Sequence, residues 1–228
     1  MSEVLLFDFF GTLVGYEQDW TALGYPRSHA LVAGMGFHGD QDAFVAAWDA
    51  ASRVLEAQSA ITLHEPSMAD YAEAFAQYAH VELADRERGE LAATFNTEWS
   101  EHIYPISGAA DLLVALGSSY RLGVVSNTND PAMVPRFVAE HFADAEFEHL
   151  VLSVDHGFRK PHPSIYAAAC ARFAIDPSDA VFVGDSFDAD YEGPMAAGMR
   201  ALLIDPTSRH PLPESDRLDS ILHLADRV

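Results

Sequence analysis

The sequence is poor in cysteine, in lysine and in long apolar runs. Cys170 is the only cysteine among 228 residues, so no disulfide can form within the chain. Its place in the apolar run AAACARFA favours a buried structural thiol over a catalytic one. No apolar run approaches the ~18 residues that a membrane span needs. The start, MSEVLLFDFFGTLV, lacks the basic end of a signal peptide. We therefore expect a soluble, cytoplasmic protein.

Basic residues are also scarce. The chain has 13 lysines and arginines against 35 aspartates and glutamates, which gives a net charge of −22. Such a field repels nucleic acid and anionic membranes, so we expect neither as a partner. Lys160 is the only lysine, and this fits either a salt-adapted proteome or a coding preference for arginine. In a chain that otherwise uses arginine, this single lysine indicates that the loop around residue 160 has a specific role. The sequence carries no signal of oligomeric state.

The N-terminal part of the chain has one short predicted strand, followed by a long stretch in which apolar residues recur at helical spacing. The apolar run Val4–Phe7 is closed by Asp8 and a turn, which predicts a buried strand. From residue 16 to 103, apolar residues then recur at helical spacing in four segments: 27–35, 41–57, 67–79 and 85–99. Asp40 and Ser67 are candidate N-caps. This stretch is expected to be an all-helical domain.

After Pro105 the pattern alternates between helix and strand. Helices are predicted over 109–116, 132–142, 164–173 and 189–197, and strands over 121–125, 150–154, 180–183 and 201–204. The strands are apolar on both faces, as in a parallel sheet that helices cover on both sides. We therefore predict an α/β protein with a doubly wound parallel sheet. Residues 1–15 and 104–228 would form its core, and residues 16–103 a helical cap domain inserted after the first strand.

Polar residues cluster where the predicted strands end. Asp8 follows the first strand, and two further polar groups, Ser126–Asn127 and Gly184–Asp185–Ser186, follow later ones. A fourth group, Arg159–Lys160, lies in a loop. Ligands of doubly wound sheets bind outside the carboxyl ends of the strands. A single aspartate after a strand is usually a turn former or a helix cap. Four such segments at one edge of a sheet indicate a functional site.

These segments carry a family resemblance. Asp8-Phe9-Phe10-Gly11-Thr12-Leu13 resembles the first motif of the haloacid dehalogenase-like superfamily. The other three motifs are similar to Ser126-Asn127, to Lys160-Pro161, and to Gly184-Asp185-Ser186 with Asp190. The helical insert resembles the cap of one group of its members. The resemblance implies a Rossmann-like core and a hydrolase with Asp8 as its covalent nucleophile.

The same resemblance implies the rest of the site. The expected substrate is a small molecule, and the expected cofactor is Mg²⁺. The residues expected to bind the reacting anion are Gly11, Thr12, Ser126, Asn127 and Lys160. Those expected to hold the metal ion are Asp8, the backbone carbonyl of Phe10, Asp185 and Asp190.

The residue types support this chemistry independently. A carboxylate such as Asp8 can attack phosphorus and form an acyl phosphate, which divides one difficult displacement into two. Attack by one anion on another requires positive charge, which Mg²⁺ and Lys160 would supply. Lys160 would also lower the pKa of Asp8. Thr12 and Ser126 offer hydroxyl donors, and the turn at Gly11 lets backbone N–H groups approach an oxyanion. Thr12 fits turn capping equally well.

Phe10 departs from the pattern of the family's phosphatases, which have a second aspartate there that protonates the leaving group. General acid–base help is worth ~10²–10⁴ in rate, so alkyl phosphates should react slowly. Tyr16, Asp19 and His29 are candidates to replace the lost group, although a surface or packing role also fits each of them.

An aromatic residue at this position also occurs in the family's 2-haloacid dehalogenases, whose halide leaving group needs no proton. Asp8 would then attack carbon, and Arg27 would bind the halide. Those enzymes use no metal and have a neutral residue at the place of Asp185. Three carboxylates without a cation would raise one another's pKa values. We therefore favour a Mg²⁺-dependent phosphatase acting on a small phosphorylated metabolite. A dehalogenase and a catalytically weak phosphate-binding relative remain as alternatives.

Overall fold

The computed structural model describes residues 4–17 and 19–228. Their contacts divide the chain into two compact units. One unit consists of the segment up to Tyr16 together with Tyr104–Val228, and the other of Glu17–Ile103. Each unit has its own hydrophobic core, so each is described by itself.

A six-stranded parallel sheet forms the centre of the first unit. Its strands, in spatial order, are β5 (His149–Leu152), β4 (Arg121–Ser126), β1 (Val4–Phe7), β6 (Ala180–Gly184), β7 (Arg200–Ile204) and β8 (Arg217–Leu218). Every residue of β1 and β6 is buried, because helices cover both faces of the sheet. The predicted α/β class and doubly wound parallel sheet are confirmed.

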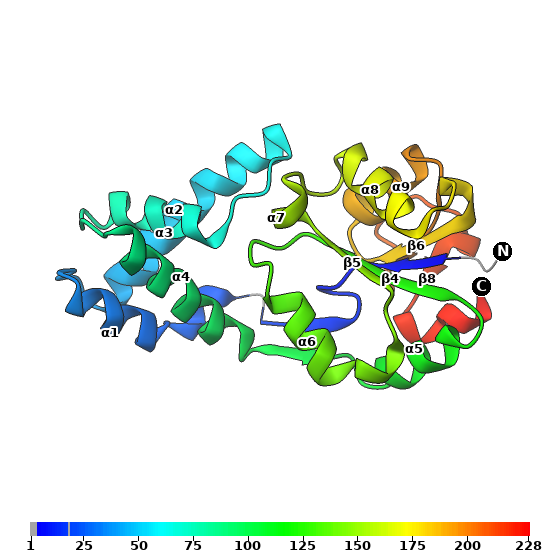
Figure 1. The fold of residues 1–228 in the computed structure, drawn as a ribbon, viewed down its shortest axis with the longest axis horizontal. Helices are drawn as coiled ribbons and strands as arrows, with labels where there is room; N and C mark the ends of the chain where they lie inside the picture. Colours follow the sequence, from blue (N-terminus) through cyan, green and yellow to red (C-terminus); the bar gives the residue numbers. More distant parts are fainter. Residues whose placement is uncertain (1–3, 18) are drawn as a thin grey trace. The chain divides into compact units, whose positions relative to one another are not determined.

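Four helices cover this sheet in two layers. Figure 1 shows α5 (Ala109–Gly117) and α6 (Met133–His141) on one side, and α8 (Pro163–Phe173) and α9 (Gly193–Ala196) on the other. The core under α8 joins Val4 and Leu6 of β1 to apolar side chains of the helix. Short helical turns complete the unit: η2 (Ala143–Ala145), η3 (Pro177–Asp179), η5 (Glu214–Asp216) and η6 (Ile221–Asp226).

Two predicted elements differ in the structure. The strand expected over 150–154 ends at Leu152, and a one-turn helix, α7 (Ser153–His156), follows. The chain turns there because the buried Ser153 hydroxyl accepts a hydrogen bond from the Thr128 N–H at 2.8 Å and donates one to the Thr128 carbonyl at 3.1 Å. The helix expected over 189–197 begins earlier, as the π-helical turn η4 (Phe187–Glu192), and continues as α9.

A second, two-stranded sheet pairs β2 (Val14–Tyr16) with β3 (Ile103–Pro105). Neither strand is evident from the hydrophobic pattern, since each has only three residues.

Among the described residues, no helix combines the length and the apolar character that crossing a membrane requires.

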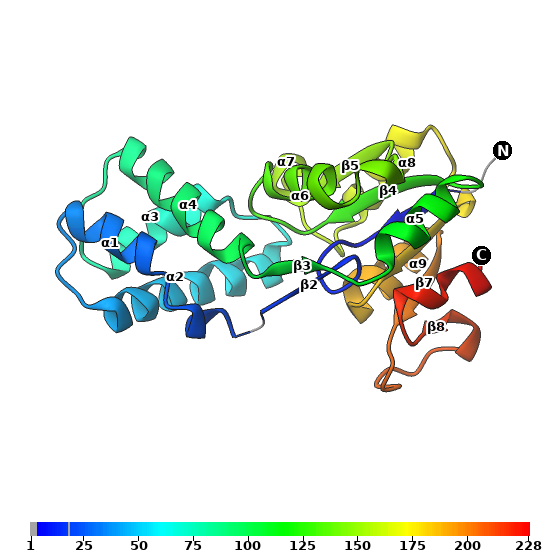
Figure 2. The ribbon, with the colours of Figure 1, turned by 90° about the horizontal axis from the view of Figure 1, so that it is seen from below.

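The described part of the second unit consists of helices and the loops between them, apart from Ile103, which begins β3 (Figure 2). The helices are η1 (Trp20–Leu23), α1 (Pro26–Gly34), α2 (Gln41–Thr62), α3 (Met68–Tyr78) and α4 (Asp85–Ser100). Aromatic rings fill its core: the Phe95 ring stacks on Trp48 at 3.9 Å and on Tyr25 at 4.1 Å between ring centroids. Asp40 and Ser67 cap α2 and α3 through their side chains, as predicted. The all-helical insert after the first strand is thus confirmed.

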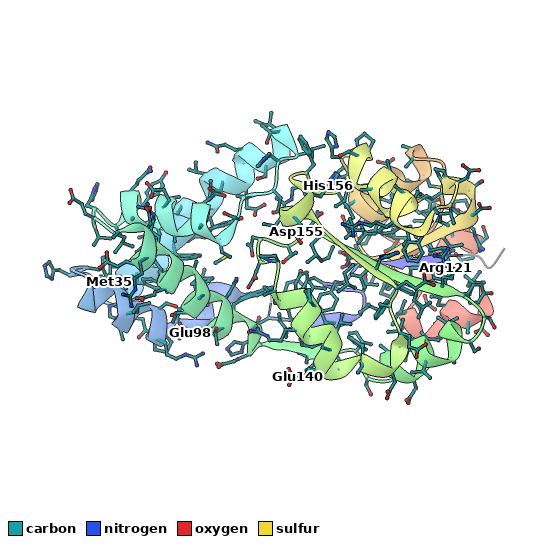
Figure 3. All side chains as sticks on the ribbon, viewed as in Figure 1. Met35, Glu98, Arg121, Glu140, Asp155 and His156 are labelled. Carbon is teal, nitrogen blue, oxygen red and sulfur yellow. The ribbon has the colours of Figure 1, made fainter. Side chains whose placement is uncertain are left out.

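Glu98, labelled on α4 in Figure 3, ties α4 to the start of α1. Its carboxylate is buried and accepts hydrogen bonds from the backbone N–H groups of Arg27 and Ser28, at 2.7 and 2.8 Å, and from the Ser28 hydroxyl at 2.5 Å. The N-terminal turn of a helix has unpaired N–H groups and a positive dipole end, so a carboxylate stabilises it. Glu98 is therefore a structural acid of the helical unit.

We predict that Glu98→Gln destabilises the protein by about 2 kcal/mol, because a neutral amide accepts these hydrogen bonds more weakly and brings donors of its own. Urea unfolding monitored by circular dichroism measures the change. Glu90→Gln is the matched control, since Glu90 is an exposed acid paired with Arg86 in the same helix. It should cost less than ~0.5 kcal/mol. Equal losses in the two variants would contradict the role of Glu98.

Candidate functional site

The register of the sheet brings three of the four motifs to one edge. Phe7 lies opposite Val183 of β6 and opposite Val124 of β4. Asp8 is therefore level with Gly184 on one side and with Val125 on the other. Asp185 and Ser126 each lie one residue further along. The carboxyl ends of three adjacent parallel strands thus place the first, second and fourth motifs together.

Lys160, in the loop between α7 and α8, joins the site through its ammonium group. Its Nζ lies 2.7 Å from Asp8 Oδ1 and 2.7 Å from Asp190 Oδ1. All three side chains are buried, and that of Lys160 is only 1% exposed. A buried cation between two carboxylates is well compensated, and removal of any one partner would leave an uncompensated charge.

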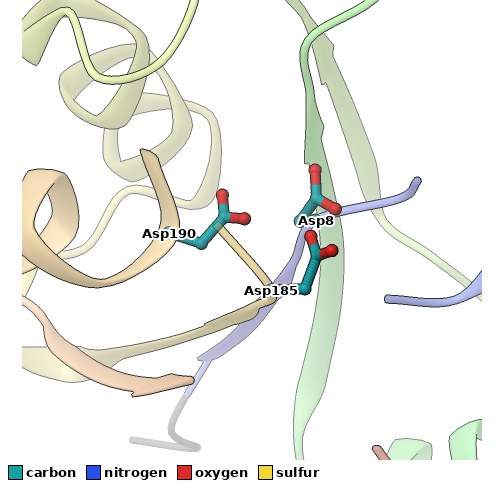
Figure 4. Close-up of side chains that lie close together, drawn as sticks. All are labelled: Asp8, Asp185 and Asp190. Carbon is teal, nitrogen blue, oxygen red and sulfur yellow. The ribbon is translucent and has the colours of Figure 1, made fainter. Parts of the chain in front are cut away.

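Three carboxylates meet at this point (Figure 4): Asp8, Asp185 and Asp190 each offer an oxygen within 4.8 Å of the others. Asp8 Oδ2 is buried and has no hydrogen-bond partner among the described residues. The buried hydroxyl of Thr12 likewise has none within the described parts of the chain. Buried polar atoms without partners are rare in proteins, and two of them beside a cluster of charged groups are consistent with a ligand site.

The carboxylates have perturbed pKa values. Burial and the charges of Asp190 and Asp185 raise the pKa of Asp8 to about 7, although Lys160 opposes the shift. Desolvation and the charge of Asp190 raise the pKa of Asp185 to about 6. Asp185 is exposed to water, so the charge of Asp190 affects its pKa more than desolvation does. Burial favours the neutral form of Lys160, but the charges of Asp190 and Asp8 outweigh it and raise the Lys160 pKa.

The turn after β1 presents the first motif. The Phe9 carbonyl accepts hydrogen bonds from the N–H groups of Thr12, Leu13 and Val14, at 3.4, 2.9 and 3.1 Å, which folds the chain sharply back. Gly11 adopts a φ of +83°, and a Cβ there would lie 2.2 Å from Asp185 Oδ2. Only glycine allows both this backbone conformation and the close approach of Asp185.

Asp190 is held at both of its oxygens. Oδ1 accepts from Lys160, and Oδ2 accepts from the Ser186 N–H at 3.0 Å. The Tyr166 hydroxyl, from α8, donates to the Ala189 carbonyl at 2.6 Å and so fixes the preceding residue. Sequence reasoning missed Tyr166, because a tyrosine at helical spacing carries no signal of such a contact.

The two residues of the second motif, Ser126 and Asn127, have different hydrogen-bond partners. Ser126 is buried, and among the described residues its hydroxyl is seen to make one long hydrogen bond, 3.3 Å, to the Asn127 carbonyl. It is therefore available to a bound anion. The side chain of Asn127 instead pairs with the backbone of Lys160, at 2.8 and 3.1 Å. The pairing uses one of the two N–H groups of this amide, so the expected contact with phosphate through the other N–H stays a prediction.

The three candidates for the missing acid/base group have different positions. Tyr16 lies in the first unit, with its ring perpendicular to that of Phe10 at a centroid distance of 6.0 Å. Desolvation and the charges of Asp185 and Asp8 raise its pKa. In the helical unit, Asp19 accepts a hydrogen bond from the Thr21 hydroxyl, and His29 contacts the Gly39 carbonyl. Tyr16 is thus the candidate that shares a unit with Asp8.

Arg27, the expected halide ligand, is engaged within the helical unit. Its guanidinium lies 2.8 Å from Glu101 and 3.5 Å from Glu98, and these two acids raise its pKa. The positive charge is therefore already balanced by two carboxylates of the segment around the end of α4. This arrangement weakens the case for Arg27 as an anion-binding group.

The acidic cluster fits a divalent cation. Carboxylate and carbonyl oxygens are the ligands that Mg²⁺ prefers. Asp8 has an oxygen without a partner among the described residues, and Asp185 is exposed at the rim of the site. Asp8, Asp185 and the Phe10 carbonyl would hold the ion. Asp190, whose two oxygens accept hydrogen bonds, would add negative charge beside them.

A sequence profile of the haloacid dehalogenase-like hydrolases matches residues 3–198. The chain belongs to this family. The match covers all four motifs and the helical insert, so the resemblance inferred from the motifs is confirmed. The enzyme class that follows from the family is hydrolase.

Curated relatives of this hydrolase include phosphatases. A glyceraldehyde 3-phosphate phosphatase of Pyrococcus abyssi is 30% identical over 113 residues, 49% of this chain and 47% of that protein. A phosphoserine phosphatase of Thermus thermophilus is 30% identical over 130 residues, 55% of this chain and 50% of that protein. A ribulose-1,5-bisphosphate 5-phosphatase of Halopiger xanaduensis is 25% identical over 221 residues, 94% of this chain and 90% of that protein. The chain thus spans about half the length of the first two relatives.

Solved structures of both enzyme types share the fold. A 2-haloacid dehalogenase from Pseudomonas syringae superposes with a TM-score of 0.70 at 21% identity, covering 100% of this chain and 98% of that chain. A HAD phosphatase from Thermococcus onnurineus superposes with a TM-score of 0.66 at 20% identity, covering 98% and 96%. At these identities the likeness shows the fold and does not separate the two reactions.

We predict that Gly11→Ala abolishes most activity by displacing Asp185. The added Cβ also meets a positive φ, which costs about 1 kcal/mol. Gly36→Ala is the matched control, because Gly36 has a φ of +106° with nothing within 4 Å of the added Cβ. Both variants should lose similar stability in thermal unfolding, and only Gly11→Ala should lose turnover. Full activity in Gly11→Ala would contradict the packing of Asp185 against this turn.

We predict that Mg²⁺ stabilises the hydrolase more at about pH 8 than at about pH 5.5, because bound metal requires deprotonated carboxylates. Without metal, the raised pKa of Asp8, about 7 against 3.8, has the opposite effect. The folded state keeps a proton that the unfolded chain has released, so stability falls as pH rises through this window. Thermal unfolding with Mg²⁺ and with chelator at both pH values measures both trends. A Mg²⁺ shift independent of pH would contradict this assignment.

Proposed function

We propose that this hydrolase is a Mg²⁺-dependent phosphatase that acts on a small phosphorylated metabolite, with Asp8 as covalent nucleophile. The acidic cluster carries the proposal. Three carboxylate side chains lie close together, and the ammonium group of Lys160 contacts two of them, Asp8 and Asp190. One oxygen of Asp8 has no hydrogen-bond partner among the described residues. With all four groups ionised, the cluster bears excess negative charge. An anionic substrate approaches such a site only when a cation is also bound.

Each residue of the site has a separate role in the proposed reaction. A carboxylate oxygen of Asp8 attacks phosphorus, the bond from phosphorus to the leaving oxygen breaks, and an acyl phosphate forms on Asp8. Lys160 favours the ionised form of Asp8 and attracts the phosphoryl oxygens, and the Thr12 and Ser126 hydroxyls donate to them. Water then hydrolyses the acyl phosphate, releasing phosphate and restoring Asp8. Mg²⁺, when bound, supplies positive charge that offsets the repulsion between the nucleophile and the phosphate.

Proton supply to the leaving group is the unusual part of this site. Phe10 has no proton to give, and its ring packs edge to face against Phe9 and Tyr16, at 5.0 and 6.0 Å. Substrates whose leaving group is already a weak base therefore fit this site best. Tyr16 remains protonated at neutral pH, because its pKa is raised.

The curated relatives support a phosphorylated substrate. Their names describe hydrolysis of glyceraldehyde 3-phosphate, phosphoserine and ribulose 1,5-bisphosphate. These compounds are small and anionic, as we propose for the substrate of this chain. Their diversity gives no reason to choose one of them.

A 2-haloacid dehalogenase is the second candidate, and Phe10 favours it, since halide departs without a proton. Two observations oppose it. Asp185 and Asp190 would repel a haloacid in the absence of a cation. The guanidinium of Arg27 is paired with Glu98 and Glu101.

Purified protein incubated with aryl phosphates, alkyl phosphates and short 2-haloacids separates these candidates. We expect aryl phosphate hydrolysis that needs Mg²⁺, stops with chelator and disappears in Asp8→Asn. Halide release that continues in chelator would establish the dehalogenase instead. No Asp8-dependent turnover of any substrate, with Mg²⁺ and phosphate still bound, would indicate a binding protein that has lost catalysis.

We predict that Phe10→Asp raises alkyl phosphate hydrolysis up to ~10²-fold, the low end of general acid catalysis, and aryl phosphate hydrolysis much less. Phe10→Asn is the matched control, because it removes the same ring without adding an acid. The ratio of kcat/KM for an alkyl and an aryl phosphate measures the effect. A folded Phe10→Asp protein with the same ratio as Phe10→Asn would show that the missing carboxylate does not limit the rate.

A further inference from the structure

The amide of Asn127 forms a two-point contact with the backbone of the residue that carries the catalytic ammonium. The Lys160 N–H donates to Asn127 Oδ1 at 2.8 Å, and Asn127 Nδ2 donates to the Lys160 carbonyl at 3.1 Å. One donor and one acceptor of the amide are thus engaged with one residue. The alternative orientation of the amide would set donor against donor and acceptor against acceptor, so the pairing also fixes which atom is oxygen.

Lys160 needs this support because of where it lies. The loop between α7 and α8 has no strand or helix around residue 160 that would hold the polar groups of its backbone. A side chain from the end of β4 takes the place of such backbone hydrogen bonds. Asn127 comes directly after Ser126, the last residue of a buried central strand, so its own backbone is well anchored.

The ammonium of Lys160 tolerates little displacement. It makes 2.7 Å contacts to Asp8 and to Asp190 at the same time, in a site where its side chain is 1% exposed. A shift of its backbone would lengthen at least one contact and leave a carboxylate less well neutralised. Misplacement of a reacting group by about 1 Å can cost ~10²-fold in rate.

We infer that Asn127 is a positioning residue: its amide holds the Lys160 backbone so that the ammonium stays between Asp8 and Asp190. The expected contact of the amide with phosphate, through its second N–H, stays a separate prediction. The inference rests on the proposed function only through the role of Lys160. The contact itself does not depend on the substrate.

A double-mutant cycle tests the inference, because it measures whether Asn127 acts through Lys160. The four proteins are the wild type, Asn127→Ala, Lys160→Ala and the double variant. We expect Asn127→Ala alone to lower kcat about 10- to 100-fold with KM changed less than about threefold. In the Lys160→Ala background the same substitution should lower kcat less than about twofold. Equal losses in both backgrounds, or a rise in KM as large as the fall in kcat, would make Asn127 a direct ligand of the substrate.

Two further readouts on the same proteins need no turnover. Calorimetric titration with inorganic phosphate and Mg²⁺ should show that Asn127→Ala weakens phosphate binding only when Lys160 is present. Thermal unfolding should behave differently, because the amide bonds to the backbone of residue 160 and not to its side chain. The fall in melting temperature caused by Asn127→Ala should be the same in the wild-type and the Lys160→Ala backgrounds. No fall in either background would show that the two-point contact is absent.

Ser153→Ala is the matched control. Ser153 makes two hydrogen bonds to the backbone of Thr128, so it links the segments after β4 and β5. It should lose stability and keep kcat within about twofold. A loss of kcat as large as that of Asn127→Ala would mean general loosening of these segments, and would overturn the specific role of Asn127.

These outcomes can be told apart from failure of the proposed function. A wild type that releases halide and ignores phosphate esters overturns the phosphatase. The cycle can then be measured on the haloacid, since Lys160 faces Asp8 in either reaction. A wild type with no turnover still leaves the phosphate titration and the unfolding cycle to decide whether Asn127 acts through Lys160.

Discussion

The contact of one buried ammonium with two buried carboxylates constrains the rest of the site. Lys160 Nζ lies 2.7 Å from both Asp8 and Asp190, and these three residues come from three separate segments of the chain. Desolvation makes each charge costly on its own, so the three are stable only together. The sheet edge, the turn after β1 and the π-helical turn that carries Asp190 all serve to bring these groups into register.

The cluster stays electrostatically incomplete without a ligand. One lysine does not balance three carboxylates, which, together with burial, explains why the pKa of Asp8 is raised to about 7 even though it contacts a cation. Under the proposed function, the same deficit lets the site bind a metal ion and an anionic substrate together. Positive charge added at the carboxylates lowers the free energy of their ionised forms and admits an anion next to them. Binding of cation and substrate is therefore expected to be mutually supportive.

Phe10 changes the chemistry of this site without changing its framework. The four motifs, the parallel sheet and the helical insert are those of the family, while Phe10, two positions after Asp8, cannot transfer a proton. Its ring packs against the rings of Phe9 and Tyr16. Under the proposed function, the site therefore suits leaving groups that depart as weak bases. The chemistry of the leaving group thus becomes a main determinant of which substrates react quickly.

The sequence by itself determined the fold class, most helices and strands, and the residues of the four motifs, because periodicity and strand-end polarity are local signals. The prediction from the sequence carried one strand two residues beyond its end at Leu152. It also missed β2, β3 and the turn that begins at Phe187. At these places a few hydrogen bonds outweigh the hydrophobic pattern. Only the tertiary structure decided that Asn127 contacts the Lys160 backbone and that Glu98 and Glu101 neutralise Arg27. Partners distant in sequence determine those roles, and a linear pattern carries no information about which partners meet.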